Sequence, residues 1–220
     1  MFKPIMHTIF DFDGTIANSS PGIFNAISYV TQCMGLQPLS EEQKRKHIGP
    51  PIDKAYGDSF GINEGQLKKA TGLHKQYMYE KGYKELVFYQ GMEKIIEDLK
   101  KAGIIVSIAT LKSDEVIKKI CREFGFLSKV DIVHGYDDNP ETNKAKLIGK
   151  CISESGIGPE FTIMIGDTEH DLNASLAAGI GFIGVSYGFG TWCREVQGSM
   201  VKGIAKDTIE LYDIITATTG

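Results

Sequence analysis

Short apolar runs alternate with helical patterns through most of the chain, and this alternation restricts the possible folds more than any other feature. Each run is rich in β-branched residues and predicts a buried strand, and a segment with apolar residues at helical spacing adjoins each one. Strands that alternate with helices predict a parallel sheet covered on both faces. The expected strands are 104–109, 130–133, 161–165, 181–185 and 201–205, and the expected helices are 92–101, 113–124, 142–155, 169–178 and 208–215.

One further apolar run, residues 5–10, is separated from the others by a long segment with a different pattern. Residues 21–82 show helical spacing interrupted by glycine and proline, and Ser40 with Gln43 fits a capping box. Because the first run must join the sheet, this segment predicts a helical insert. We therefore expect a three-layer, Rossmann-like α/β core made of residues 1–15 and 87–220, with an all-helical insert at 16–86.

Composition and charge narrow the class of protein. Of 220 residues, 42% are apolar and 24% are charged, which excludes a disordered, collagen-like or membrane-embedded chain. The net charge of −4 gives no field that attracts nucleic acid or an anionic membrane, and no apolar run approaches the roughly 20 residues of a membrane span. The N-terminal run is too short for a signal peptide. The cysteines Cys33, Cys121, Cys151 and Cys193 are scattered, so we expect reduced thiols in the cytoplasm.

Polar residues follow several of the expected strands at the point where each ends. Asp11 and Asp13 follow the first strand and Thr110 the next, and Lys144 and Lys146 both begin the helix after the third. The segment 166–171 adds Asp167 and Asp171. In an open parallel sheet these positions meet at one edge, where ligands bind. Singly, each has a simpler interpretation: a turn residue, a solvated lysine or, for Thr168 and Asp171, a helix cap.

Together these residues indicate phosphate chemistry. Carboxylates crowded at one edge raise each other's pKa values, and a hard cation such as Mg²⁺ removes that penalty. One carboxylate of the Asp11–Asp13 pair can attack phosphorus while the other handles the leaving-group proton. Backbone N–H groups of Gly14 and Thr15 are candidate phosphate donors, as are the side chains of Thr110 and Lys144.

These residues resemble the haloacid dehalogenase superfamily over nearly the whole chain. Residues 11–15 (DFDGT) match its first motif, Thr110 the second, Lys144 the third and residues 166–171 (GDTEHD) the fourth. The helical insert resembles the small α-helical cap of this superfamily, and residues 19–23 and 48–51 resemble its phosphoglycolate-phosphatase-like branch. Ala145 after Lys144, where relatives often have proline, and Asn18, where they often have aspartate, depart from the pattern.

The resemblance implies a role for each matched residue. Asp11 is the implied nucleophile, which forms an aspartyl-phosphate, and Asp13 is the implied general acid and base. Mg²⁺ is implied as the cofactor, held by Asp11, the carbonyl of Asp13 and Asp167, with Asp171 in support. The presence of Asp13 disfavours dehalogenation. The implied phosphate-binding set is Gly14, Thr15, Thr110, Leu111 and Lys144, with Lys146 an alternative to Lys144.

The expected activity is hydrolysis of the phosphate monoester of a small metabolite, with phosphoglycolate the first substrate candidate and a nucleoside monophosphate the second. A sugar-phosphate mutase uses the same site, and a receiver-type signalling module also collects Asp, Thr and Lys at strand ends. Within the basic run 44–47, Arg45 and Lys46 are candidates to bind the end of the substrate remote from phosphate, although a solvated helix face explains the run equally well. The sequence does not distinguish a monomer from a homodimer.

Overall fold

The computed structural model describes residues 4–190 and 200–217, and its centre is a parallel sheet. Six strands lie in the order β5-β4-β1-β6-β7-β8, and every neighbouring pair is parallel. The expected parallel sheet is confirmed. The strands are β1 (His7–Phe10), β4 (Ile105–Ser113), β5 (Ile132–Tyr136), β6 (Thr162–Gly166), β7 (Gly181–Val185) and β8 (Val201–Ala205).

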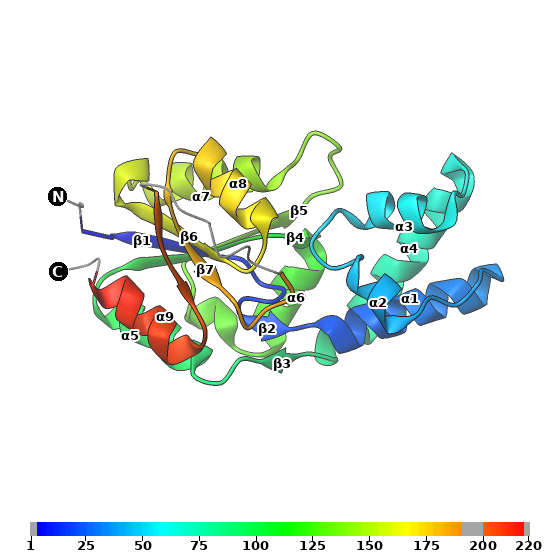
Figure 1. Ribbon diagram of the computed structural model, residues 1–220, viewed down its shortest axis with the longest axis horizontal. Coiled ribbons are helices and arrows are strands. Elements are labelled where there is room, and N and C mark those ends of the chain that lie inside the picture. The colour runs from blue at the N-terminus through cyan, green and yellow to red at the C-terminus, as the bar shows by residue number, and fades with distance from the viewer. Residues whose placement is uncertain (1–3, 191–199, 218–220) are drawn as a thin grey trace.

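Helices cover both faces of this sheet, which makes the three layers (Figure 1). One face is covered by α5 (Met92–Lys101), α6 (Asp114–Glu123) and α9 (Thr208–Ala217), and the other by α7 (Lys144–Ser155) and α8 (Glu169–Ala177). Single turns of 3-10 helix lie at η1 (Gly82–Lys84), η2 (Phe126–Ser128) and η3 (Pro159–Phe161).

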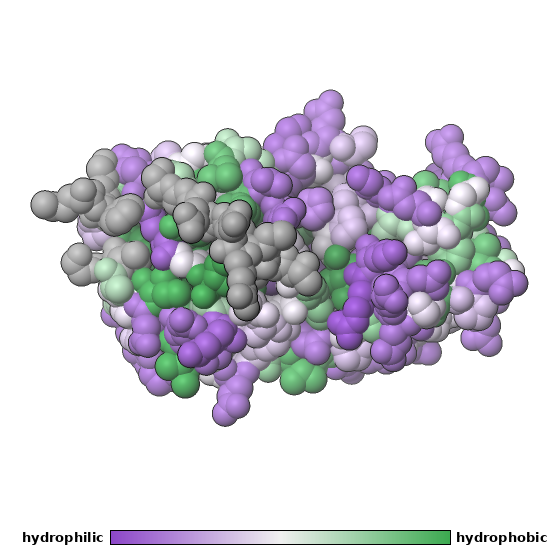
Figure 2. All heavy atoms as spheres, in the orientation of Figure 1, coloured by the Kyte–Doolittle hydropathy of each residue, from purple (hydrophilic) through white to green (hydrophobic). Residues whose placement is uncertain are grey.

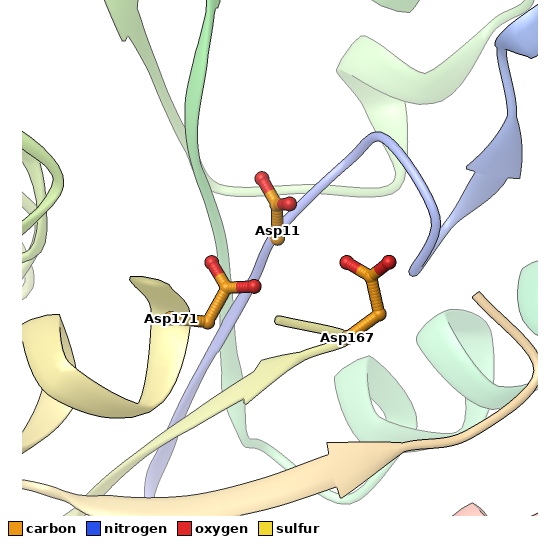
Figure 3. A group of neighbouring side chains, drawn as sticks. All are labelled: Asp11, Asp167 and Asp171. Carbon is orange, nitrogen blue, oxygen red and sulfur yellow. The ribbon is translucent and has the colours of Figure 1, made fainter. Parts of the chain in front are cut away.

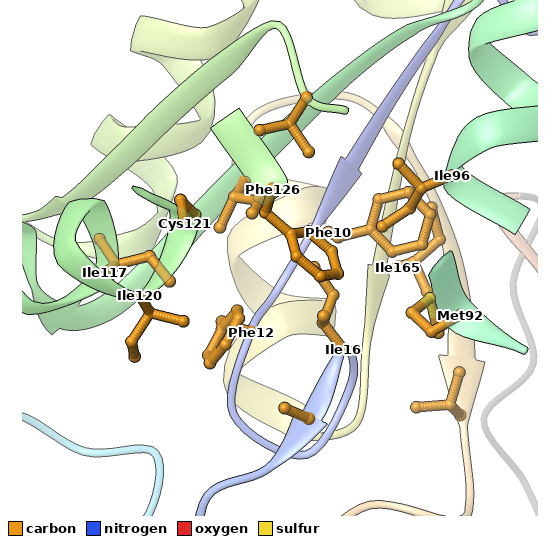
Figure 4. Packing of buried hydrophobic residues seen from close by; sticks show 14 of the residues in the cluster. Phe10, Phe12, Ile16, Met92, Ile96, Ile117, Ile120, Cys121, Phe126 and Ile165 are labelled. Carbon is orange, nitrogen blue, oxygen red and sulfur yellow. The ribbon is translucent and has the colours of Figure 1, made fainter. Parts of the chain in front are cut away.

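Strand β1 has apolar residues on both faces because it lies at the centre of the sheet. Phe10 packs into the cluster with α5 and α6, whereas its neighbour Ile9 packs into the cluster with α7. Figure 4 shows Phe10 beside Ile96 and Ile165, with Phe12 on the side of α6. Burial on both faces explains why the adjacent residues Ile9 and Phe10 are both apolar, although their side chains point to opposite sides of the sheet.

The insert between the first strand and the rest of the sheet is helical, as expected. Its helices are α1 (Ser20–Met34), α2 (Glu41–Arg45), α3 (Ile52–Phe60) and α4 (Glu64–Glu80), which lie at one end of the molecule in Figure 1. Figure 2 shows hydrophilic residues over much of this cap. The predicted capping box is present: Gln43 N donates to Ser40 Oγ at 3.2 Å, and Ser40 N donates to Gln43 Oε1 at 2.8 Å.

Two short strands that the sequence did not predict join the cap to the core. β2 (Ala17–Asn18) and β3 (Val87–Phe88) form an antiparallel pair, so the two connections to the cap run side by side. Two-residue strands carry too little pattern to be recognised in a sequence. The domain limits at 15/16 and 86/87 stay a prediction.

Strand β4 continues to Ser113, beyond the expected end at residue 109. Its pairing with β5 shifts register between Ala109 and Ser113. The expected side-chain cap by Ser113 is not formed in the described structure; Asp114 Oδ1 instead accepts a hydrogen bond from Gly135 N at 3.1 Å. The extended strand therefore carries Lys112, as well as Thr110, to the edge of the sheet.

Two findings bear on the other sequence expectations. Cys33, Cys121 and Cys151 are free thiols, and Cys193 lies outside the described residues. Within 4–190 and 200–217, none of the helices combines the length and the apolar character that crossing a bilayer requires.

Candidate active site

Asp11 lies directly after β1, where the chain leaves the sheet. Its backbone N–H donates to Ile165 O at 2.9 Å, which ties this position to the neighbouring strand β6. The chain then turns sharply at Gly14, which has φ +89°. Asp167 follows β6, so two carboxylates come from the ends of adjacent parallel strands.

Three buried aspartates gather at this edge of the sheet. Figure 3 shows Asp11 after β1, Asp167 after β6 and Asp171 from the first turn of α8 around a common space. One carboxylate oxygen of each lies within 4.8 Å of those of the other two. Asp171 also completes the predicted cap, because Thr168 N and Oγ1 donate to its Oδ2 at 3.0 and 2.7 Å. The capping and the functional interpretations of Asp171 are therefore compatible.

Lys144, and not Lys146, lies in this cluster. The Lys144 ammonium is 2.6 Å from Asp11 Oδ1 and 2.6 Å from Asp171 Oδ1, and the residue is buried. The Lys146 ammonium is exposed and lies 3.5 Å from Glu141. Lys144 is the first residue of α7, where the helix begins after Asn143. Lys144 and Lys146 are two residues apart, so their side chains leave α7 on different sides of the helix.

The cluster has more negative than positive charge, and the pKa values reflect this. Burial raises the pKa of Asp11 to about 8, since Asp171, Asp167 and Asp13 oppose the favourable effect of Lys144. Burial also raises the pKa of Asp167 to about 6, with a further contribution from Asp171. Burial alone would lower the pKa of Lys144, but Asp11 and Asp171 outweigh it and the pKa rises.

These carboxylates fit a hard divalent cation. All donors in the set are oxygens, which Mg²⁺ prefers. Burial raises the pKa values of Asp11 and Asp167, and a bound cation would offset this penalty on their ionised forms. Within the described part of the chain, the buried Oδ1 of Asp11 accepts no aligned hydrogen bond, although Lys144 lies close to it.

Glycines allow the backbone to approach Asp167, and the sequence analysis missed this feature. Added Cβ atoms at Gly14 and Gly188 would overlap the side chain of Asp167, and one at Gly190 would overlap its backbone. The close approach lets Phe189 N and Gly190 N donate to Asp167 Oδ2 at 2.7 and 3.3 Å. The spacing Gly188-Phe189-Gly190 after β7 is the only signal in the sequence, and it has no specific meaning without the fold.

Asp13 lies beside the cluster and is held through one of its oxygens. Its Oδ1 accepts a hydrogen bond from Ser19 Oγ at 2.5 Å, and the Lys112 ammonium is 3.0 Å from the same atom. Neither Ser19 nor Lys112 was among the predicted site residues. Lys112 occupies the position two residues after Thr110, so the extension of β4 is what brings it here.

The expected phosphate donors Gly14 and Thr15 need a correction. Gly14 N donates to Ala17 O at 2.9 Å, and Thr15 N donates to Phe12 O at 3.3 Å. The turn itself uses these N–H groups, so they are not available to phosphate. Gly14 instead supplies the positive φ and the space for Asp167, and Thr15 Oγ1 lies 3.5 Å from Asp167 Oδ1.

A cavity lies between this edge of the sheet and the cap, and it contains the other predicted residues. Thr110 and Leu111 line it together with the aspartate pair and Lys144. The predicted specificity residues Arg45 and Lys46 are both exposed, and neither is among the residues that line the cavity. The cap and nearby core residues that do line it include Ile23, His47, Pro50, Ile52, His74, Lys75, Met78, Lys112 and Tyr136.

Comparisons with known proteins agree with this geometry. A family model described as haloacid dehalogenase-like hydrolase matches residues 8–185. A 5'-nucleotidase from Pseudomonas aeruginosa is 28% identical over 184 residues, which cover 83% of each chain. A phosphoglycolate phosphatase from Chromobacterium violaceum is 27% identical and aligns over 97% of each chain. The crystal structure of a predicted phosphatase from Clostridium acetobutylicum has a TM-score of 0.89 at 27% identity, covering 98% of this chain and 100% of that one.

Proposed function

The chain belongs to the haloacid dehalogenase-like hydrolases, and we propose that it is a Mg²⁺-dependent phosphatase that hydrolyses the phosphate monoester of a small metabolite. The observation that carries this proposal is the position of Asp11. Its buried carboxylate faces a cavity, with the Lys144 ammonium 2.6 Å away and Asp13 lining the same space. This arrangement suits a nucleophile with a separate proton donor beside it.

In the proposed first step, an oxygen of Asp11 attacks phosphorus. The bond between phosphorus and the ester oxygen breaks, and Asp13 gives its proton to that oxygen as the alcohol leaves. Thr110 and Lys144 donate hydrogen bonds to the phosphoryl oxygens, where negative charge spreads in the transition state. The product of this step is an aspartyl-phosphate on Asp11.

In the second step, water replaces the alcohol. Asp13, now ionised, takes a proton from water as the water oxygen attacks phosphorus, and the bond to Asp11 breaks. Inorganic phosphate leaves, and both carboxylates return to their starting states. Asp11, the carbonyl of Asp13 and Asp167 would hold Mg²⁺, with Asp171 beside them in support, and the cation would supply positive charge that favours the ionised carboxylates and the charged phosphoryl group.

Phosphoglycolate is the substrate we propose first, because relatives named phosphoglycolate phosphatase align over nearly the whole chain. A nucleoside monophosphate is the second candidate, on the basis of the 5'-nucleotidase relative. A sugar-phosphate mutase differs only in the acceptor of the phosphoryl group, and no specific contact in the cap favours it. The family match over residues 8–185 argues against a receiver module.

Phosphate release from p-nitrophenyl phosphate, with and without Mg²⁺, tests the function. We expect turnover that depends on Mg²⁺ and a loss of about a thousandfold or more in Asp11→Asn. Equal activity in that variant would overturn the assignment of Asp11. Comparing kcat/KM for phosphoglycolate and nucleoside monophosphates then identifies the substrate class, and product analysis with a hexose 1-phosphate separates hydrolysis from transfer.

A further inference from the structure

Two buried histidines of the cap line the cavity opposite the aspartates. His47 precedes α3 and is 3% exposed, and His74 lies in α4 and is 7% exposed. Tyr56 lies between them, with its ring roughly perpendicular to each imidazole at centroid distances of 5.1 and 5.7 Å. His47 is the last residue of the basic run 44–47, in which the sequence analysis named Arg45 and Lys46 as the candidates, and His74 had no predicted function.

Tyr56 fixes the proton of His74. The Tyr56 hydroxyl lies 3.0 Å from His74 Nδ1, and Tyr56 is fully buried. A buried hydroxyl that keeps its proton donates it to the neighbouring acceptor, so Nδ1 accepts and the proton of the neutral imidazole is on Nε2. His74 therefore has an N–H at Nε2 that its contact with Tyr56 does not use.

His47 has an unused ring nitrogen as well. Its Nε2 lies 2.9 Å from Ser59 Oγ on the exposed side of the cap. Its Nδ1 is buried and has no hydrogen-bond partner within the described part of the chain. An unpaired buried polar atom costs stability, and His47 is one of the residues that line the cavity, so a ligand in the cavity can supply the missing partner.

The surroundings of the two histidines define what that ligand must offer. Lys75, next to His74, and Lys112 of the core line the same cavity, but their ammonium groups are paired with Asp138 and Asp13 respectively. Among the described lining residues, the carboxylates are Asp11 and Asp13, both at the catalytic edge. The described lining residues therefore offer no carboxylate at the cap end to accept a hydrogen bond from the two imidazoles. A group bound there must contribute oxygen acceptors.

We propose that His47 and His74 form a specificity subsite that binds an oxygen of the leaving group, a carboxylate or a hydroxyl, through His47 Nδ1 and His74 Nε2. This inference rests on the proposed phosphatase function, because the ester bond lies at the aspartate edge and the leaving group extends towards the cap. The leaving group of a plain alkyl ester has no oxygen beyond the ester bond, so it would leave His47 Nδ1 and His74 Nε2 without this partner. The two residues thus select among phosphate esters without touching the reacting atoms.

Three phosphate esters with a two-carbon leaving group test the subsite: ethyl phosphate, 2-hydroxyethyl phosphate and phosphoglycolate. In the native chain we expect kcat/KM to be at least about tenfold higher for one of the oxygen-bearing esters than for ethyl phosphate. The hydroxyl and carboxylate arms show which oxygen is preferred. Equal values for all three esters would contradict the subsite.

Amide substitutions test which nitrogen of each ring acts. Asparagine places an amide where Nδ1 lies, and glutamine places one where Nε2 lies. We expect His74→Gln and His47→Asn to keep most of the selectivity ratio, and His74→Asn and His47→Gln to lower it about tenfold. If the two histidines had only a structural role, the variants that keep the contacts with Tyr56 and Ser59, His74→Asn and His47→Gln, would keep the ratio. The other two variants would then lower it. His134→Gln, at a histidine paired with Glu154 outside the cavity, is the matched control that keeps the ratio.

A binding measurement keeps the inference separate from the proposed function. Glycolate and ethylene glycol are added to the native protein with Mg²⁺ and inorganic phosphate, and the imidazole NMR signals are followed, with ethanol as the control. We expect the His47 and His74 signals to shift with the first two compounds only. Shifts without hydrolysis of any ester would refute the phosphatase and retain the subsite, whereas hydrolysis with silent imidazoles and no selectivity would refute the subsite alone.

Discussion

The ammonium of Lys112 lies 3.0 Å from Asp13 Oδ1, and the two side chains are only 6% and 13% exposed. Ser19 Oγ binds the same oxygen. Both partners act on Oδ1, so Oδ2 is the oxygen left to exchange a proton with the substrate. Lys112 is in this respect a positioning residue for the proposed acid.

We predict that Lys112→Met lowers kcat/KM, which reports the steps up to formation of the aspartyl-phosphate, about tenfold or more for an alkyl phosphate and much less for p-nitrophenyl phosphate. The alkoxide leaving group needs a proton from Asp13, whereas nitrophenolate leaves without one. Steady-state kinetics with both substrates give the comparison. Lys118→Met is the control, because Lys118 pairs with Asp114 on the surface of α6. Equal losses with both substrates would mean that Lys112 affects binding or folding instead.

The two lysines at the start of α7 provide a second prediction. Lys144→Met removes the buried partner of Asp11 and Asp171, so we expect at least a hundredfold loss of activity and a loss of stability of about 3 kcal/mol. Lys146→Met should change either quantity little, since its ion pair with Glu141 is exposed. Phosphate release and urea unfolding measure both. Similar behaviour of the two variants would contradict the assignment.

The raised pKa values predict how Mg²⁺ and pH act together. In the metal-free protein the pKa of Asp11 is about 8 and that of Asp167 about 6, and both lie above the pKa of a carboxyl in the unfolded chain. The folded chain therefore binds more protons than the unfolded chain, and its stability falls as pH rises from about 4 to 8. Mg²⁺ replaces the bound protons. We therefore expect Mg²⁺ to raise Tm more at pH 8 than at pH 5.5, as measured by calorimetry with and without a chelator.

Asp167→Asn is the variant that checks this linkage. It replaces one carboxylate of the cluster by a neutral amide, so the rise in Tm on adding Mg²⁺ should be smaller at pH 8. Glu141→Gln, at an exposed acid outside the cluster, should leave the rise intact. A Mg²⁺ effect that is the same at both pH values would show that the cation binds elsewhere.

Buried neutral histidines oppose stability in acid, and His7 is one of three whose pKa burial lowers, with His47 and His74. His7 is fully buried in β1, with Ser107 Oγ 2.7 Å from its Nε2, and burial lowers its pKa to about 4 although Asp131 opposes the shift. The unfolded chain then binds more protons, so stability is retained above the unfolded pKa of about 6.5 and lost as pH falls towards 4. The expected loss from this group is about 2 kcal/mol between pH 7 and pH 5. Urea unfolding of His7→Gln at both values should show a smaller loss; an unchanged loss would assign the acid sensitivity to other groups.

The sequence correctly predicted the elements whose position depends on residues close together in the chain. The strands Gly181–Val185 and Val201–Ala205 have the predicted bounds, and the polar residues Ser186 and Lys206 follow them directly. Asp11, Asp167 and Asp171 meet because parallel strands end at a common edge, which topology alone requires.

Contacts between distant segments account for what the sequence did not reveal. Lys112 reaches Asp13 only because β4 continues through a register shift against β5. The unavailable N–H groups of Gly14 and Thr15 depend on the turn conformation, and the positions of the cap side chains depend on how the helices pack. Residue type and spacing carry none of this information.

Gly14 and Gly179 form a matched pair for the last prediction. Both have positive φ, at +89° and +70°, so alanine is strained at either position. At Gly179 a Cβ meets no atom within 4 Å, whereas at Gly14 it would overlap Asp167 and the ring of Phe189. Gly179→Ala should cost about 1 kcal/mol of stability with unchanged Mg²⁺ affinity. Gly14→Ala must displace Asp167, so we expect its Mg²⁺ affinity, measured by the dependence of activity on Mg²⁺ concentration, to fall at least about tenfold; equal affinities in the two variants would show that Asp167 does not need the space that Gly14 leaves.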